Sequence, residues 1–417
     1  MKNTTAVILA AGKGTRMKSG LPKVLHEVGG KPMLERVIAN LRSAGVDDII
    51  TVVGHGSGAV KKLFDGQTRF VEQKELLGSG HALSRAVDLL PEKGKVLVAC
   101  GDAPLISPAS FGSILEACRE EGASCAVLTC EMRDPFSYGR IFRGEKGEVL
   151  RIVEEKDLAS PEEKAVREVN TGTYCFESSD IKAFVSRIEM NEKKKEFYLT
   201  DIVGILRAEG REVAARTCPE EEAIGINTRA DLAAANRTLN MDKIKDLMDN
   251  GVTIVSPENT YVAEDALIGK DTVIFPGTVI DGGVTVGSGC RIGPMAHLRT
   301  GTVIGDRVEI GNFTEINRTR IAEGTRVKHQ AYLGDATVGR DVNIGAGTVT
   351  ANYDGKRKNP TVIEDGAFIG IGARLVAPVK IGKGAVVGAG AVVTRGRDVG
   401  AGETVAGIPA RPVNGSK

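Results

Sequence analysis

The sequence lacks the features that mark membrane proteins, secreted proteins and nucleic-acid binders. No apolar run approaches the roughly 18 residues of a membrane span. The 7 cysteines are scattered without a CxxC pair, which argues against disulfides and a structural zinc. The opening apolar run is too short for a signal-peptide core and turns directly into a glycine loop. Because the formal net charge is only +1, no overall basic field favours nucleic acid. We therefore expect a cytoplasmic protein with neither a nucleic-acid nor a membrane partner.

Glycine is abundant, and its distribution divides the chain. Half of the 52 glycines lie in the last third of the 417 residues. Before that, residues 1–229 alternate short apolar runs with amphipathic segments, which is typical of a parallel sheet with helices on both faces. Residues 230–251 have helical spacing and are predicted to form a linker helix. The expected strands are 4–11, 47–54 and 95–102, and the expected helices are 33–45 and 80–90.

From residue 252 to residue 417 the period changes to six. A strict six-residue period fits neither a helix nor an alternating strand. It predicts a solenoid of about seven coils with three short parallel strands per coil, in which each aliphatic residue points into a triangular core. The polar stretch "TANYDGKRKNPT", residues 350–361, interrupts the pattern and is predicted to be a coil insertion. The repeated positions are Val262, Ile268, Ile274, Ile280, Val286, Ile292, Leu298, Ile304, Ile310, Ile316, Val327, Leu333, Ile344, Ile363, Ile369, Leu375, Ile381, Val387, Val393, Val399 and Val405.

The stretch "LAAGKGTRMKSGLPK", residues 9–23, follows a predicted strand and precedes a predicted helix. Glycines there would let the backbone approach an anion closely, with free N–H groups facing phosphates. Arg16 and Lys23 add positive charge suited to a triphosphate. Glycine alone is weak evidence, because ordinary turns also use it.

The motifs carry a resemblance to a known family. "LAAGKGTRM" with "PK" resembles the pattern of sugar-1-phosphate nucleotidyltransferases, and the other motifs follow in that family's order: "GSGHA" at 78–82, "CGDAPL" at 100–105, "YGRI" at 138–141, "EEKD" at 154–157, "NTG" at 170–172 and "GINTR" at 225–229. With the solenoid behind it, the whole chain resembles the bifunctional N-acetylglucosamine-1-phosphate uridyltransferase/glucosamine-1-phosphate acetyltransferases. This implies an α/β fold, a Rossmann-like nucleotidyltransferase domain followed by a left-handed parallel β-helix of hexapeptide repeats.

For the first domain, the resemblance implies transfer of a uridylyl group from UTP to a sugar phosphate, with Mg²⁺ as cofactor. It also implies that Arg16 is the catalytic cation and that Asp102 and Asn227 hold the Mg²⁺, an ion that prefers oxygen ligands. An acid at the carboxyl end of a central strand suits this role, although Asp102 could instead be a simple turn residue. Glu154 could likewise lie on a solvated face without binding the sugar. His55 and His81 are predicted to be structural. The implied substrate-binding residues are Leu9, Ala10, Gly12, Lys23, Gln73, Gly78, Ser79, Gly139, Glu154, Asn170 and Asn227.

For the solenoid, the resemblance implies acetyl transfer from acetyl-CoA to glucosamine-1-phosphate. Such a transfer needs a base that takes the ammonium proton, and an imidazole suits that task. His329 in "KHQAYLGDA" matches the family's catalytic base, and Glu315 in "NFTEI" matches the carboxylate that assists it. Ala346 and Ala389 match positions that line the acetyl-CoA groove. The matching substrate positions are Arg299, Tyr332, Asn343, Asn352, Tyr353 and Lys358.

Several positions depart from the family pattern. Ser79 stands for a threonine and Cys100 for a tyrosine in the first domain. In the solenoid, Asn317 stands for a phosphate-binding lysine and Ile371 for a serine near the thioester. Two alternatives to the bifunctional enzyme therefore stay open. One is a uridyltransferase whose solenoid serves trimer assembly or holds an altered acyl site. The other is a nucleotidyltransferase of other sugar specificity with a non-catalytic solenoid. The resemblance implies a homotrimer.

Overall fold

The computed structural model describes residues 3–120 and 122–413, which form two compact units. The first unit runs up to Asn236 and the second begins at Arg237. The division falls inside α8 (Arg229–Asp249), at the place of the predicted linker helix. Within the described residues, no helix is long and apolar enough to cross a membrane.

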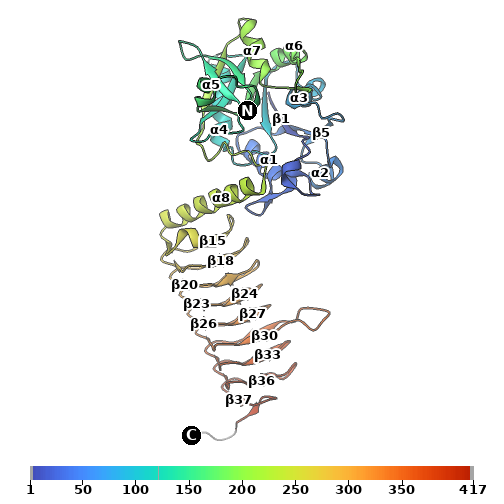
Figure 1. The fold of residues 1–417 in the computed structure, drawn as a ribbon. Helices are drawn as coiled ribbons and strands as arrows, with labels where there is room; N and C mark the ends of the chain where they lie inside the picture. Colours follow the sequence, from blue (N-terminus) through green and yellow to red (C-terminus); the bar gives the residue numbers. More distant parts are fainter. Residues whose placement is uncertain (1–2, 121, 414–417) are drawn as a thin grey trace. The chain divides into compact units, whose positions relative to one another are not determined.

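The first unit is built on a twisted sheet whose main path runs β13-β7-β10-β6-β1-β4-β5 (Figure 1). β1 lies between β4 and β6 and is parallel to both. The prediction of a purely parallel sheet is wrong for β10, which runs antiparallel to β6 and β7. The reason is local, because β10 pairs with the β8–β9 hairpin and needs no crossover helix. The strands are β1 (Thr4–Ala10), β4 (Asp48–Val53), β5 (Arg69–Glu72), β6 (Lys95–Cys100), β7 (Cys125–Glu131), β8 (Arg140–Arg143), β9 (Val149–Val153), β10 (Glu168–Glu177) and β13 (Val213–Thr217), with two small hairpins, β2 (Glu27–Val28) with β3 (Lys31–Pro32) and β11 (Met190–Asn191) with β12 (Glu196–Phe197).

Helices cover both faces of this sheet, as the alternation of segments predicts. Successive residues of β1 point to opposite faces, so Ile8 enters one core and Val7 the other. Helices α1 and α4 contribute to the core around Ile8, and α3, α6 and α7 contribute to the core around Val7. The helices are α1 (Met33–Ser43), α2 (Ser57–Leu63), α3 (Ser79–Ser84), α4 (Pro108–Glu120), α5 (Pro161–Ala165), α6 (Ser178–Phe184) and α7 (Asp201–Ala208).

The second unit is a β-helix whose described strands stack into three parallel sheets (Figure 1). The first sheet contains β14 (Thr253–Ile254), β17 (Val273–Ile274), β20 (Arg291–Ile292), β23 (Glu309–Asn312), β26 (Arg326–His329), β29 (Asn343–Ile344), β32 (Phe368–Ile369), β35 (Val386–Val387), β37 (Thr404–Ala406) and the antiparallel β38 (Arg411–Pro412). The second contains β15 (Tyr261–Val262), β18 (Val279–Ile280), β21 (His297–Leu298), β24 (Glu315–Asn317), β27 (Tyr332–Gly334), β30 (Val349–Ala351), β33 (Arg374–Val376) and β36 (Val392–Val393). The third contains β16 (Leu267–Ile268), β19 (Thr285–Val286), β22 (Val303–Ile304), β25 (Arg320–Ile321), β28 (Ala336–Val338), β31 (Thr361–Ile363) and β34 (Val379–Ile381).

The six-residue repeat fills the core of this β-helix. Ile274, Ile292 and Ile310 lie directly above one another and are almost wholly buried. Removing each such side chain from water contributes about 1.5–3 kcal/mol. The slips in the pattern arise where coils lose one residue, since Ile304 stacks on Ile321 rather than on the residue after it. The repeat therefore continues through the shorter coil. Ile321 is a core position that strict six-residue counting does not include.

The predicted coil insertion is the loop between β30 and β31, which projects from the stack beyond the label β30 (Figure 1). Tyr353 and Lys358 form an antiparallel bridge at its base, with the ammonium 4.5 Å from the tyrosine ring centre. Asp354 accepts hydrogen bonds from the backbone of Arg357 at 2.9 Å and from Arg395 at 3.0 Å. These bonds lower the pKa of Asp354, and the backbone bond from Arg357 has the largest effect. The carboxylate therefore stays charged and holds the loop in shape.

Candidate active sites

The glycine loop lies where β1 ends, at the carboxyl edge of the central strands. Gly14 has a φ of +60°, and a Cβ there would lie 2.7 Å from the Cβ of Lys23. A side chain would therefore be strained and would also collide with Lys23. Glycine at this position lets Lys23 fold back toward β1, which is where open α/β sheets bind ligands.

A pocket of about 560 Å³ opens at this loop. It brings together most of the residues predicted for the nucleotide. Ala10, by contrast, is buried under the loop and does not line the pocket. Lys13, Thr15 and Glu196 also line it and were not singled out from the sequence. The predicted residues that line it are Leu9, Gly12, Arg16, Lys23, Gln73, Gly78, Ser79 and Asn227.

Four of the predicted residues form one charged cluster beside this pocket. The ammonium of Lys23 is bonded to Asp102 and lies 2.9 Å from the Oδ1 of Asn227. Arg16 donates to the same oxygen at 2.8 Å. The loops that carry Asp102 and Asn227 are tied together, because the backbone N–H of Ile226 donates to the carbonyl of Asp102 at 2.9 Å.

This cluster fits a hard cation. Asp102 and Asn227 direct two oxygens at one positive charge, the ammonium of Lys23. The described residues contain no cluster of three or more His, Cys, Asp or Glu side chains suited to a metal. Two protein oxygens match Mg²⁺, which keeps several waters and shares substrate phosphates. The assignment of Asp102 and Asn227 to a metal stays a prediction that this geometry allows.

The residues predicted to bind the sugar lie together at a second place in the same unit. Asn170 donates its backbone N–H to the carbonyl of Gly139 at 2.9 Å, and a Cβ at Gly139 would lie 3.7 Å from Glu154. Glu154 is not on a solvated face: burial raises its pKa, and the hydroxyl of Thr200 donates to it at 3.0 Å, which opposes the rise. Thr200 is a partner of Glu154 that the motifs did not reveal.

Cys100, the departure from the family's tyrosine, is a packing residue. Burial raises its pKa to about 12, so the thiol stays protonated. Its sulfur lies 3.6 Å from the carbonyl of Gly172. All seven cysteines are free thiols in the structure.

In the second unit, His329 lies at the end of β26 and lines a pocket of about 300 Å³. Its Nδ1 lies 3.2 Å from the Oδ1 of Asn312, the residue beside it on β23. An amide oxygen only accepts, so Nδ1 carries the proton and the lone pair of Nε2 is left free for a substrate. The sequence did not single out Asn312.

The predicted partner of His329, Glu315, makes a different contact. Glu315 accepts a hydrogen bond from Arg299 at 2.9 Å, and its neighbour on the next strand is Tyr332. Within the described chain, Glu315 is therefore paired with a predicted substrate residue rather than with the histidine. Its assistance to His329 stays a prediction.

Of the remaining predicted residues of the solenoid, three lie in or next to its insertion loop and Asn343 lies on another sheet. Asn352 is buried and donates to Asp335. Tyr353 and Lys358 are exposed and lie in the insertion loop itself. Asn343 lies on β29, paired with Arg326 of β26 and Phe368 of β32.

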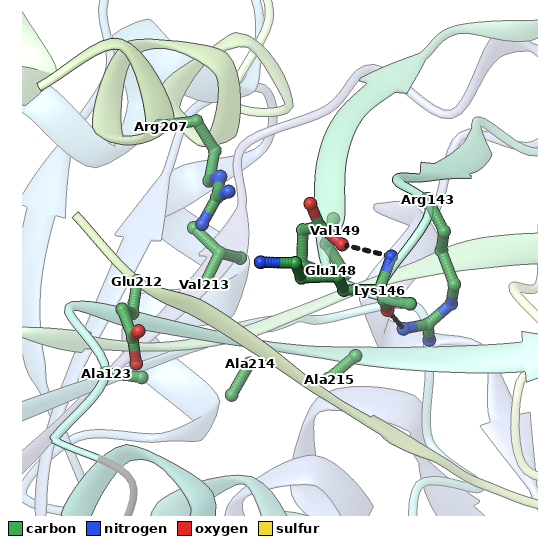
Figure 2. Close-up of a pocket in the computed structure, with 11 residues that line it drawn as sticks. Ala123, Arg143, Lys146, Glu148, Val149, Arg207, Glu212, Val213, Ala214 and Ala215 are labelled. Atoms are coloured by element: carbon green, nitrogen blue, oxygen red, sulfur yellow. Dashed lines mark hydrogen bonds between the residues drawn. The ribbon is translucent and has the colours of Figure 1, made fainter. Parts of the chain in front are cut away.

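A further pocket of about 270 Å³ lies at the outer strand β13 of the first unit (Figure 2). Arg143, Lys146 and Arg207 approach it together with Glu148 and Glu212. Its charges are of both signs, and none of the residues predicted for a site lines it. It therefore lies apart from both candidate sites.

Comparison with known proteins assigns the family. The family model of the MobA-like NTP transferase domain matches residues 6–164, and that of the bacterial transferase hexapeptide (six repeats) matches residues 265–300, 283–318 and 360–395. The bifunctional protein GlmU of Carboxydothermus hydrogenoformans is 44% identical over 433 residues, covering 96% of this chain and 94% of its own length. That of Shouchella clausii is 42% identical over 420 residues, covering 92% of each. The chain belongs to the GlmU family. This confirms the predicted fold class, a Rossmann-like nucleotidyltransferase domain followed by a left-handed parallel β-helix.

Asn317, which departs from the GlmU pattern by replacing a lysine, has the positively charged Arg318 beside it. Asn317 is buried, and its Oδ1 accepts a hydrogen bond from Arg318 at 2.9 Å. The guanidinium of Arg318 is partly exposed and also binds Asp335 at 2.6 Å. This contact with Arg318 lowers the pKa of Asp335. A fixed cation therefore stands next to the place where the family's lysine is missing.

The other departure, Ile371, lies between the two residues predicted to line the acetyl-CoA groove. The N–H of Gly372 donates to the carbonyl of Ala346, and the N–H of Gly390 donates to the carbonyl of Ile371, both at 2.7 Å. Ala346, Ile371 and Ala389 therefore occupy one corner in successive coils. The Ile371 side chain is 65% exposed, so its bulk stands on the surface of that corner.

Proposed function

We propose that the chain makes UDP-N-acetylglucosamine in two steps. The second unit transfers an acetyl group from acetyl-CoA to glucosamine-1-phosphate. The first unit then transfers a uridylyl group from UTP to N-acetylglucosamine-1-phosphate and releases pyrophosphate. The proposal rests on the convergence of Arg16, Lys23, Asp102 and Asn227 beside one pocket, in a chain that matches GlmU proteins over nearly its whole length.

For uridylyl transfer, a phosphate oxygen of the sugar attacks the α-phosphorus of UTP, and the bond to pyrophosphate breaks. Such a transfer needs charge neutralisation and alignment more than a covalent group on the protein. Arg16 and Lys23 bind the phosphates as these enter the pocket, which releases the oxygens of Asp102 and Asn227 from their contacts with the two cations. Asp102 and Asn227 would hold a Mg²⁺ ion, which supplies further positive charge to the phosphates when bound. Gly139, Glu154 and Asn170 bind the sugar.

For acetyl transfer, the amine of glucosamine-1-phosphate attacks the thioester carbonyl, and the bond to the coenzyme A sulfur breaks. His329 takes the proton from the ammonium at its Nε2, while Asn312 holds Nδ1–H in place. Arg299, Tyr332, Asn343, Asn352, Tyr353 and Lys358 bind the sugar phosphate, and Ala346 and Ala389 line the coenzyme groove. Arg318 supplies the positive charge that the Asn317 position lacks.

Two assays on the purified protein test both steps. Pyrophosphate release from UTP with N-acetylglucosamine-1-phosphate tests the first unit, and thiol release from acetyl-CoA with glucosamine-1-phosphate tests the second. Thiol release no faster than background would leave the uridyltransferase alone, an alternative that the exposed Ile371 favours. Pyrophosphate release with another sugar phosphate only would instead indicate a nucleotidyltransferase of other specificity.

We also place the protein in the cytoplasm as a homotrimer, in which the acetyl transfer sites lie between subunits. This would explain why the predicted substrate residues of the solenoid spread over several sides of one chain. Sedimentation at assay concentrations tests it, and a monomer that is fully active in acetyl transfer would contradict it.

Replacing Asn312 with alanine is expected to lower kcat for acetyl transfer by about 10–100-fold, because Nδ1 of His329 loses the acceptor that fixes its tautomer. Since Asn312 is not assigned to bind substrate, the KM values should change less. An aspartate at this position keeps an acceptor and should preserve more activity than alanine. Equal rates for wild type and Asn312→Ala would contradict a positioning role.

Replacing Ile371 with serine is expected to lower the KM for acetyl-CoA by up to about tenfold, since one aliphatic branch that crowds a bound coenzyme costs about 1–3 kcal/mol. Pyrophosphate release should not change. The matched control is Val255→Ser, an exposed aliphatic residue of the same β-helix at a distant coil. A KM for acetyl-CoA that stays the same or rises would show that Ile371 does not narrow the groove.

A further inference from the structure

His81 has a contact that a merely structural histidine does not need. It lies on α3, half-buried, and does not line the nucleotide pocket. Its Nδ1 lies 3.1 Å from the side-chain nitrogen Nε2 of Gln73. Gln73 itself is only 3% exposed and does line the pocket. His81 thus touches the pocket through Gln73.

The two hydrogens of the Gln73 amide nitrogen are both used by the protein. One is donated to the carbonyl of Gly78 at 3.0 Å, and the other points to Nδ1 of His81. An amide nitrogen only donates, so Nδ1 of His81 is the acceptor and its ring is neutral with the proton on Nε2. Turning the amide round would place its oxygen against the Gly78 carbonyl, which repels it.

This arrangement decides what Gln73 offers to a ligand. With both hydrogens turned toward Gly78 and His81, the oxygen Oε1 is the group left for the pocket, and no donor from the described residues reaches it. Uracil carries a hydrogen on N3, which such an oxygen accepts. Cytosine carries a lone pair on N3, which the same oxygen repels.

We propose that His81 is a positioning residue that holds Gln73 as a hydrogen-bond acceptor, so that the site selects uracil over cytosine nucleotides. The inference rests on the proposed uridylyl transfer and on Gln73 meeting the base. His81 acts from behind the pocket. Its removal therefore changes the choice of base rather than the chemistry at phosphorus.

The test is the ratio of kcat/KM for UTP to kcat/KM for CTP, measured by pyrophosphate release. In His81→Ala, one hydrogen of a buried amide loses its acceptor, and we expect the ratio to fall by about tenfold or more. The loss should appear mainly in the KM for UTP. His81→Asn offers an amide oxygen close to the place of Nδ1 and should restore most of the ratio. The control His55→Ala removes an exposed histidine of the same unit and should leave the ratio unchanged.

A double-mutant cycle separates positioning from general damage. If His81 acts through Gln73, the ratio should be the same in Gln73→Ala and in the double variant. An unchanged ratio in His81→Ala, no rescue by His81→Asn, or a further fall in the double variant would each overturn the inference. A wild-type protein that releases no pyrophosphate from UTP would contradict the proposed function itself. A wild type that prefers UTP, with the same UTP-to-CTP ratio in His81→Ala, would contradict only this inference.

Discussion

Replacing His329 with alanine is expected to lower the rate of acetyl transfer by about 10²–10⁴-fold, the usual contribution of a general base. Without the imidazole, the ammonium of glucosamine-1-phosphate must lose its proton to water before it can attack the thioester. Thiol release measures this step. Uridylyl transfer should keep its wild-type rate, because the residues proposed for it belong to the other compact unit.

The control for this variant is His297→Ala, another histidine of the β-helix. His297 contacts Asp281 at 3.2 Å and is not assigned to either site. It should keep both activities. Full acetyl transfer in His329→Ala would show that the histidine is a surface residue of the solenoid and would favour the uridyltransferase alone. Equal losses in both histidine variants would indicate damage to the coils rather than loss of a base.

Replacing Asp102 with asparagine is expected to lower uridylyl transfer by at least about a hundredfold, since the charge that balances two cations and a metal is lost. Lys23 would then face two neutral amides. Its ammonium would repel a divalent ion, and no carboxylate would be left to attract that ion. Thiol release from acetyl-CoA should be unchanged. Mn²⁺ binding, followed by electron paramagnetic resonance, gives a readout that does not depend on turnover. With UTP present, we expect Asp102→Asn to bind Mn²⁺ more weakly than the wild type.

The matched control is Asp88→Asn, an exposed carboxylate of the same unit that lies outside the pocket. It should leave pyrophosphate release and Mn²⁺ binding as in the wild type. Thermal unfolding of both variants shows whether the unit is intact. If the Asp102→Asn protein is folded, binds Mn²⁺ normally and turns over UTP, Asp102 is a turn residue and not a metal ligand.

The fold was predictable where one local rule repeats. The six-residue spacing of aliphatic residues indicates the β-helix because every coil obeys the same steric rule, and one shorter coil does not hide it. The α/β unit was predictable for the same kind of reason, since buried strands and amphipathic helices have distinct periods. The antiparallel β10 was not predictable in this way, because the direction of a strand depends on the route of the chain between strands and not on the strand's own residues.

The candidate sites were predictable as far as motifs mark them. The motifs single out Arg16, Lys23, Asp102, Asn227 and His329. They do not reveal the partners that give those groups their direction. Asn312 is 17 residues from His329 along the chain and meets it only because successive coils stack. Thr200 is likewise 46 residues from Glu154.

By itself, the sequence determined the α/β unit, the β-helix and the residue types that chemistry at two sites needs, because these follow from local spacing. Only the tertiary structure decided which atom each group presents. Coil stacking places Asn312 at Nδ1 of His329 and leaves Nε2 free. The turn before α3 places Gly78, and α3 itself places His81, at the amide nitrogen of Gln73, which leaves its oxygen for the pocket. A hydrogen bond depends on positions within a few tenths of an ångström, and those are set by the packing of segments that are distant in the chain.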